Sequence, residues 1–212
     1  MSDREQLLSE EEVGFLTEMM NIGAGNAAAA LSQMLQSEVN VIIPAVHVIP
    51  VTQAPSVLGD PSLPVTCVRM GMVGDVAGDM FFIVPEEHKV KLTHLVQRAT
   101  PGPKSRGTDI DLSVLTEIGN IVAGVYLTAV HDFCKLNIYH TVPVVAIDMI
   151  QSLLDESLVR LSRQVQVAIT IENEFIVEKE RIRTFLVMIP SMESVNTLVN
   201  SIGQAKMAYR EG

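Results

Sequence analysis

The sequence LTEMMNIGAG at residues 16–25 returns in the second half of the chain as LTEIGNIVAG at residues 115–124. The match continues at the same offset, without a gap, to three further identical pairs: Ala30 and Ala129, Pro44 and Pro143, and Val46 and Val145. A gapless match over about thirty residues indicates an internal repeat. The sequence therefore predicts one domain, residues 1–212, made of two copies at about 9–99 and 108–210. The Pro- and Gly-rich residues 100–107 are expected to link them.

Each copy is predicted to begin with a long helix. Ser9 and Glu12 have the spacing of a capping box at a helix N-terminus. Apolar and small residues follow at helical spacing from Val13 onward. In the second copy the same pattern is expected to begin near Thr108 or Asp109.

The rest of each copy predicts a strand segment, a hairpin and a closing amphipathic helix. These are residues 39–48, 65–73 with 79–84, and 86–98 in the first copy, and 138–147, 164–172 with 182–188, and 192–207 in the second. Each half looks too small to bury its own sheet, so the hairpins are expected to join. The expected fold is α/β (α+β) with pseudo-twofold symmetry, in which long helices pack on one central, mostly antiparallel sheet.

The composition excludes several classes of function. The chain of 212 residues has 15 Lys and Arg against 25 Asp and Glu, a formal net charge of −10. Nucleic acid is therefore not expected as a partner, because phosphate binding needs a basic surface. Its two cysteines, Cys67 and Cys134, are far apart in sequence, which argues against a disulfide framework or a cysteine-based zinc site. The five histidines show no ligand spacing, so no metal site is expected.

The chain also lacks the patterns of secretion and membrane insertion. Its first residues, MSDRE, have neither a basic region nor an apolar core. The most apolar stretch, residues 39–51, is interrupted by Asn40, Pro44, His47 and Pro50. We therefore expect a cytoplasmic protein with no membrane insertion.

The most specific feature is a Glu-x-x-Asn pair in each predicted long helix. Glu18 and Asn21 share one helix face because of their spacing, and so do Glu117 and Asn120. A glycine follows one turn later in both copies, so each carboxamide is left unshielded and open to another macromolecule. The alternative is a polar stripe that is merely solvated. Its repetition among diverged neighbours favours a function.

These residues resemble the CheC/CheX/FliY phosphatases of bacterial chemotaxis. In that family Glu-x-x-Asn is followed at a fixed spacing by Pro and preceded, one helical turn before the Glu, by Asp or Ser. The second copy matches the whole motif with Ser113, Glu117, Asn120 and Pro143. The resemblance covers nearly the whole chain, and the presence of two motif copies is similar to the two-site CheC members.

The first copy departs from the motif at one position. It has Glu18, Asn21 and Pro44, but Gly14 stands where Asp or Ser is expected. Glycine in a helix interior costs about 1 kcal/mol relative to alanine, whereas Ser113 could brace Glu117 from one turn earlier. The second site is therefore predicted to be at least as active as the first. Both prolines are interpreted as shaping the strand that backs the site helix, the alternative being an edge strand or a kink.

The resemblance implies hydrolysis of the aspartyl phosphate on CheY, the chemotaxis response regulator. Asn21 and Asn120 would orient the attacking water, while Glu18 and Glu117 would pair with the active-site Lys of the receiver domain. No cofactor of its own is expected, because Mg²⁺ is expected on the receiver-domain substrate.

A further segment, residues 146–156, is short and amphipathic, whereas the matching residues 50–64 of the first copy are Pro-rich and expected to form a loop. In CheC-like proteins this region docks the receptor deamidase CheD, which implies Asp148, Met149 and Leu153 as partner-binding candidates. The alternative is a helix that caps the sheet edge. A second functional hypothesis is a non-catalytic CheC-like adaptor that binds CheD or a flagellar switch component. A third is a structural relative of the switch proteins, disfavoured because those relatives lack the Glu/Asn pairs.

Overall fold

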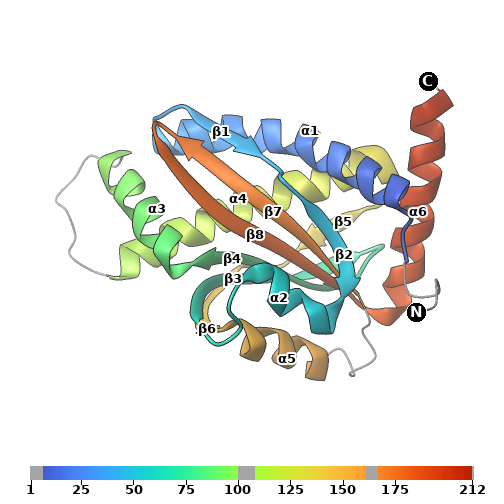
Figure 1. Cartoon of the computed structure of the whole chain (residues 1–212). Helices are drawn as coiled ribbons and strands as arrows, with labels where there is room; N and C mark the ends of the chain where they lie inside the picture. The colour runs from blue at the N-terminus through green and yellow to red at the C-terminus, as the bar shows by residue number, and fades with distance from the viewer. Residues whose placement is uncertain (1–6, 100–107, 161–166, 212) are drawn as a thin grey trace.

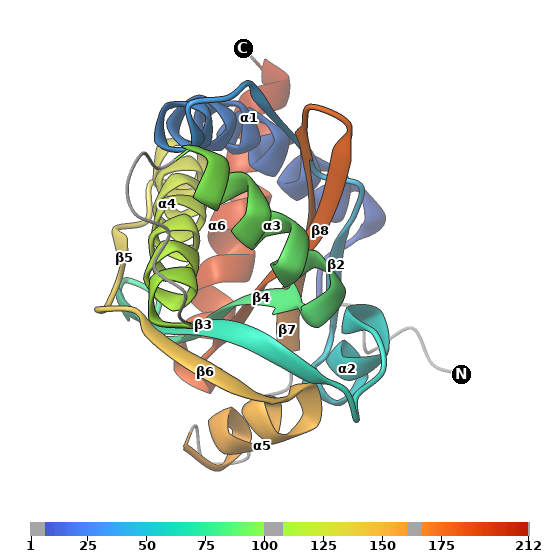
Figure 2. The ribbon, with the colours of Figure 1, turned by 90° about the vertical axis from the view of Figure 1, so that its left-hand side faces the viewer.

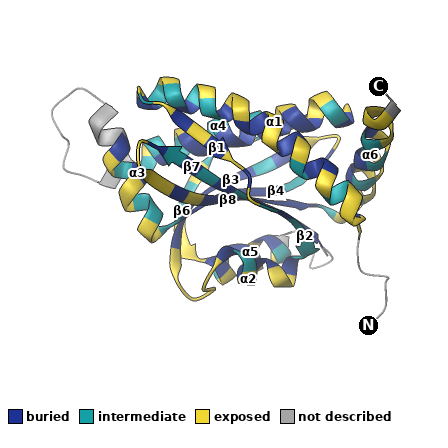
Figure 3. Cartoon of the chain, turned by 45° about the horizontal axis from the view of Figure 1, so that its top comes forward, coloured by how far each residue is buried: buried dark blue, intermediate teal, exposed yellow. Residues whose placement is uncertain are grey.

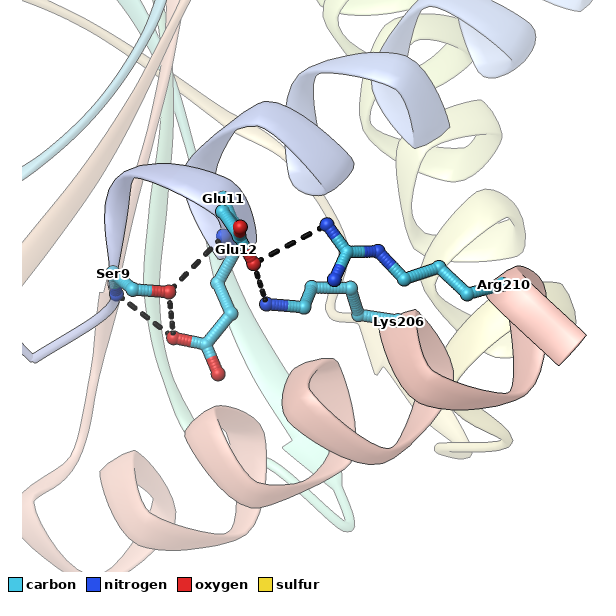
Figure 4. A network of polar contacts seen from close by, with 5 residues as sticks. All are labelled: Ser9, Glu11, Glu12, Lys206 and Arg210. Atoms are coloured by element: carbon cyan, nitrogen blue, oxygen red, sulfur yellow. Dashed lines mark hydrogen bonds and ion pairs between the residues drawn. The ribbon is translucent and has the colours of Figure 1, made fainter.

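The first helix, α1 (Glu10–Leu35), begins at the cap that the sequence predicts. Ser9 Oγ accepts a hydrogen bond from Glu12 N at 3.3 Å, and Glu12 Oε2 accepts from Ser9 N at 2.8 Å and from Ser9 Oγ at 2.7 Å (Figure 4). Two donors that the helix itself leaves unpaired are thereby satisfied. The protein is seen in a computed structural model that describes residues 7–99, 108–160 and 167–211 (Figure 1).

The second long helix, α4 (Thr108–Cys134), lies beside α1 on one face of the sheet (Figures 1 and 2). Small residues allow this close packing. A Cβ added to Gly23 of α1 would lie 3.2 Å from Tyr126 Cδ1 of α4 and 3.3 Å from Ala129 Cβ. A Cβ added to Gly119 would lie 3.0 Å from Val68 Cβ of the sheet. Side chains larger than hydrogen at these two positions would push the helices apart or off the sheet.

The described chain forms one sheet of eight strands, in which every pairing is antiparallel. The strand order is β1-β7-β8-β4-β3-β5, with β2 also beside β7 and β6 also beside β3. The strands are β1 (Val39–Ile42), β2 (Val46–Pro50), β3 (Pro64–Gly74), β4 (Gly78–Pro85), β5 (Ile138–His140), β6 (Val144–Met149), β7 (Val167–Val177) and β8 (Glu180–Pro190). The two predicted hairpins are β3–β4 and β7–β8, and they join through β4 and β8. Residues 164–166 of the second predicted hairpin lie outside the described residues.

The sheet separates two hydrophobic cores. The larger core lies under α1 and α4 and includes Phe82 and Tyr126. The smaller core includes Phe81 and Leu154 and lies on the opposite face, under two short helices, α2 (Ala54–Leu58) and α5 (Ile150–Arg160). Adjacent phenylalanines of β4 thus enter different cores, as the alternation of side chains along a strand requires. The predicted fold class, long helices on a central antiparallel sheet, is confirmed.

The closing helices α3 (Glu86–Ala99) and α6 (Met192–Glu211) follow the two hairpins as expected. Helix α6 stands across the beginning of α1 (Figure 1). Its Lys206 Nζ donates to Glu11 Oε2 at 2.9 Å, and Arg210 Nη2 lies 3.2 Å from the same oxygen (Figure 4). The last helix is therefore fastened to the first turn of the first helix.

Two local expectations need correction. Each predicted long strand segment is broken, and Pro44 and Pro143 lie in the breaks, between β1 and β2 and between β5 and β6. Proline has no N–H to give to a ladder, so pairing stops there. The Pro-rich residues 50–64, expected to form a loop, contain a 3₁₀ turn, η1 (Val51–Gln53), and helix α2. Pro55 stands in the first turn of α2, where a missing N–H costs nothing.

The same order of element types occurs twice in the described chain: long helix, two short strands, short helix, hairpin, closing helix. This is the order that the predicted duplication requires, while the duplication itself and its 9–99 and 108–210 boundaries stay predictions. The predicted linker, residues 100–107, lies outside the described residues.

One described stretch, Leu112–Cys134 of α4, is long and apolar enough to cross a membrane by length and composition. However, 50% of its most apolar window is buried within the protein. A core helix of a soluble protein meets the same criteria, so this stretch is weak evidence for a membrane span.

Candidate active site

The first Glu-x-x-Asn pair lies on the outer face of α1. Glu18 and Asn21 are exposed, whereas Leu16 and Met20 of the same turns are buried in the larger core. Figure 3 shows this division along α1, with exposed residues outward and buried residues toward the sheet. The helical periodicity thus separates the polar pair from the packing residues.

The carboxamide of Asn21 is held by two internal hydrogen bonds. Its Oδ1 accepts from the backbone N of Ile43 at 3.3 Å, and its Nδ2 donates to the carbonyl of Thr17 at 3.1 Å. A carboxamide offers two lone pairs and two N–H groups, so half of its capacity is used. We call these two bonds the Asn21 clasp.

Pro44 restricts the backbone of the residue that donates to the Asn21 clasp. It is exposed and follows Ile43 in the break between β1 and β2. A residue that precedes proline is restricted to extended conformations, which limits the directions that the Ile43 N–H can take. Pro44 thus directly follows the residue that is bonded to the site helix, and its role in shaping this segment stays a prediction.

The second pair differs from the first. Glu117 is exposed and Asn120 is half-buried on α4. Within the described ranges, neither side chain makes a hydrogen bond or an ion pair, so the full capacity of the Asn120 carboxamide is open. Pro143 follows Val142, which is 83% exposed and, unlike Ile43 in the first half, donates no hydrogen bond to the side chain of the neighbouring Asn in the described structure.

The residues one turn before each Glu are both exposed. Ser113 occupies this place on α4, and Gly14 on α1. A Cβ added to Gly14 would meet nothing within 4 Å, so packing does not require glycine there. The departure from the motif in the first half therefore has no structural cause in the contacts of α1.

The chain folds so that a groove of about 410 Å³ lies next to the second pair, between α4 and β5. It is lined by residues that include Gly124, His131, Tyr139 and His140. This groove is not predicted from the sequence, in which the five histidines show no ligand spacing. The available signal was the difference between the halves, since Val41 occupies the place of His140.

The candidate CheD-binding residues are separated by the structure. Asp148 and Met149 are exposed at the end of β6, and Asp148 Oδ1 accepts from Met149 N at 2.7 Å. Leu153 is only 4% exposed and packs in the smaller core under α5. It is thus a core residue that holds the helix on the sheet, and it is not available to a partner in this structure.

The two thiols are buried and free. Burial raises the pKa of the Cys134 thiol to about 11, and burial also raises the pKa of Cys67 far above its usual range. Neither is a thiolate near neutral pH, so neither is a nucleophile there. No group of three or more His, Cys, Asp or Glu side chains suited to a metal ion occurs among the residues that the structure describes.

Comparison with known proteins places the chain among chemotaxis proteins. The model of the CheC-like family matches residues 15–48 and 110–147, and each match contains one Glu-x-x-Asn pair with its proline. The CheY-P phosphatase CheC of Bacillus subtilis (strain 168) is 30% identical over 200 residues, covering 92% of this chain and 96% of that protein.

Two solved structures show the same fold at low identity. Thermotoga maritima FliY has a TM-score of 0.70 at 18% identity and covers 94% of this chain and 100% of its own. The FliM middle domain from H. pylori has a TM-score of 0.63 at 12% identity and covers 92% of this chain and 99% of its own. At these identities the structures support the fold alone. The extent and identity of the match to the Bacillus protein decide the family: the chain belongs to the CheC-like family.

Proposed function

We propose that this protein is a phosphatase that hydrolyses the aspartyl phosphate of CheY, mainly through Asn120 and Glu117 on α4. The observation that carries the proposal is the open carboxamide of Asn120 beside an exposed Glu117. It is joined to membership of a family in which a relative at 30% identity is a CheY-P phosphatase.

The chemistry needs only what this pair provides. An acyl phosphate is already reactive, and phosphoryl transfer depends on positioning and charge stabilisation more than on covalent help. The missing component is a water held in line with the phosphorus–oxygen bond. The carbonyl oxygen of Asn120 can accept a hydrogen bond from that water, while its N–H₂ group can donate to a phosphoryl oxygen. Asn120 thus orients the nucleophile without taking a proton.

Glu117 has a docking role in this proposal. A carboxylate placed against a phosphoryl group is repelled, which disfavours a role as general base. It lies one turn before Asn120 on the same face, where it can pair with the active-site Lys of the receiver domain. This pairing explains how a protein with a net charge of −10 approaches a phosphorylated partner. Mg²⁺ belongs to the receiver domain, and no cofactor is proposed for this chain.

The first pair, Glu18 and Asn21, is proposed to be the weaker site. The bond from Ile43 N occupies one lone pair of Asn21 Oδ1 and fixes the direction of the carboxamide, so turning the carboxamide toward a partner requires this bond to open. A typical intramolecular hydrogen bond contributes about 0.5–1.5 kcal/mol net, so the open state is the minor one. The structure thus supplies a physical reason for the expected inequality that is independent of Gly14.

The test is the decay of phosphorylated CheY, followed with the wild-type protein and with the Asn21→Ala/Asn120→Ala double variant. Wild type is expected to accelerate decay, and the double variant is expected to leave the intrinsic rate unchanged. If wild type does not accelerate decay, the protein is a non-catalytic adaptor for CheD or a flagellar switch component. If the double variant keeps full activity, the phosphatase works through other residues.

A further inference from the structure

The groove between α4 and β5 begins one turn beyond Asn120. The α4 side chains that line it include Thr128 and His131, and Gly124 forms its near end. At 1.5 Å per residue, Gly124 lies about 6 Å along the helix from Asn120, and His131 about 16 Å. The groove therefore continues the helix face that carries the second Glu-x-x-Asn pair.

Two imidazoles of the groove are fixed by the backbone. His140 Nδ1 lies 3.0 Å from the carbonyl oxygen of Thr141, and His131 Nδ1 lies 3.2 Å from that of Leu136. A carbonyl only accepts, so each ring donates through Nδ1, and Nε2 is the acceptor in the neutral ring. His140 Nε2 is 3.8 Å from the position that a Gly124 Cβ would take. The acceptor edge of His140 thus lies against α4, next to the turn of Asn120.

The first half of the chain has different side chains at the matching positions. Val41 stands where His140 does and is buried. Ser32, which matches His131, accepts a hydrogen bond from Val39 N at 2.9 Å and so ties α1 to β1. A Cβ on Gly25, the counterpart of Gly124, would meet nothing within 4 Å. At these matching positions, the imidazole accompanies the pair whose Asn is open, and a valine accompanies the other.

We propose that this recess, the α4–β5 groove, is the docking site of the phosphorylated receiver domain next to the second Glu-x-x-Asn pair. In this proposal His140 positions the bound receiver domain. This inference rests on the proposed function and names the surface that it uses. The partner segment that enters the groove carries an apolar side chain and a hydrogen-bond donor, because the lining combines Ile138 and the Tyr139 ring with the Nε2 acceptor of His140.

The size of protein interfaces supports this assignment. A standard interface covers about 800 Å² on each partner, which corresponds to a disc of about 16 Å radius. A receiver domain that presents its phosphoryl group to Asn120 therefore extends over Gly124 and His140, and its edge reaches His131. The same partner must fill the groove or leave a water-filled gap beside the reacting group.

The experiment measures binding and turnover separately. Binding of a CheY receiver domain loaded with Mg²⁺ and beryllofluoride is measured by titration calorimetry, and phospho-CheY decay is measured over a range of CheY concentrations. His140→Val introduces the side chain of the first half. Gly124→Leu fills the groove from the helix side, where only His140 Nε2 lies within 4 Å of the new Cβ. His47→Val on β2, outside both sites, is the matched control for the His-to-Val change.

Both groove variants are expected to weaken binding, and His140→Val is expected to raise KM by about tenfold with kcat retained, the effect of losing one well-packed interface residue. Gly124→Leu also shields the Asn120 carboxamide one turn earlier, so its kcat is expected to fall as well. His140→Gln, which keeps an acceptor, is expected to recover most of the loss, and the His47 control is expected to bind like wild type. Unchanged binding by both groove variants refutes the proposed docking site. This holds even if Asn120→Ala abolishes turnover, a result that would support the proposed phosphatase function. No binding by wild type also refutes the docking site. Weakened binding without any acceleration of decay by wild type upholds the groove and refutes the phosphatase.

Discussion

The Asn21 clasp predicts how the two sites divide the activity. Replacing Asn120 with Ala leaves only the first site, whose carboxamide is bonded to Ile43 N and to the Thr17 carbonyl. Replacing Asn21 with Ala leaves the open second site and removes the clasp. The Asn120 variant is therefore expected to lose most of the activity, and the Asn21 variant to keep most of it.

The size of the difference follows from the bond that must open. The Ile43 N–H bond, at 3.3 Å, is long for its type, so its net contribution is taken as about 0.5–1.5 kcal/mol. With this free-energy difference between the bonded and the open carboxamide, the open state of Asn21 is populated at about 7–30%. If the two sites are otherwise equal, Asn120→Ala retains about 7–23% of the wild-type acceleration, and Asn21→Ala retains the remainder.

The assay is the decay of radiolabelled phospho-CheY at a limiting concentration of each single variant, with thermal unfolding as the control for folding. Equal losses in the two variants would show that the clasp does not limit the first site. A larger loss from Asn21→Ala would exclude Asn120 as the main catalytic residue, since the bonded carboxamide would then carry most of the activity.

Three further predictions concern stability and a second partner. Gly119→Ala places a methyl carbon 3.0 Å from a sheet side chain and should lower the free energy of unfolding by about 1 kcal/mol net. Gly14→Ala, with open space around its Cβ, should raise the free energy of unfolding by about 1 kcal/mol. Urea unfolding measures both changes. Hydrogen bonds from Ser9 lower the pKa of Glu12, so this carboxylate stabilises the fold above the ordinary glutamate range and loses that contribution as pH falls through its lowered value. Ser9→Ala should therefore cost about 1 kcal/mol at neutral pH and less in acid; a loss independent of pH would contradict this. Met149→Glu should weaken binding to CheD in a pull-down with the purified proteins, and unchanged capture would exclude the end of β6.

Structural features that depend on residues near in sequence could be predicted from the sequence. The capping box of Ser9 and Glu12 lies within one helical turn, and its sequence spacing alone determines its geometry. The β3–β4 hairpin follows from apolar segments on either side of a turn bounded by the positive-φ glycines Gly74 and Gly78. The polar face of Glu18 and Asn21 follows from helical periodicity. Each of these features depends on residues that are near in sequence.

Features that depend on distant residues were not predicted. The bond between Ile43 and Asn21 spans 22 residues and forms only because the β1–β2 break returns beside α1. The burial of Leu153 depends on a second core beneath the sheet, which an amphipathic pattern does not reveal. The groove at His140 requires α4 and β5 to be placed together, while the matching strand β1 is closed against α1 through Ser32.

A crystal structure of this protein bound to CheY loaded with Mg²⁺ and beryllofluoride would decide whether Asn120 orients the attacking water. The expected result is the Asn120 carboxamide at about 3 Å from a fluorine atom or from a water in line with the beryllium, with Glu117 against the receiver's lysine. A complex in which Asn120 faces solvent, away from the beryllofluoride, would contradict the claim.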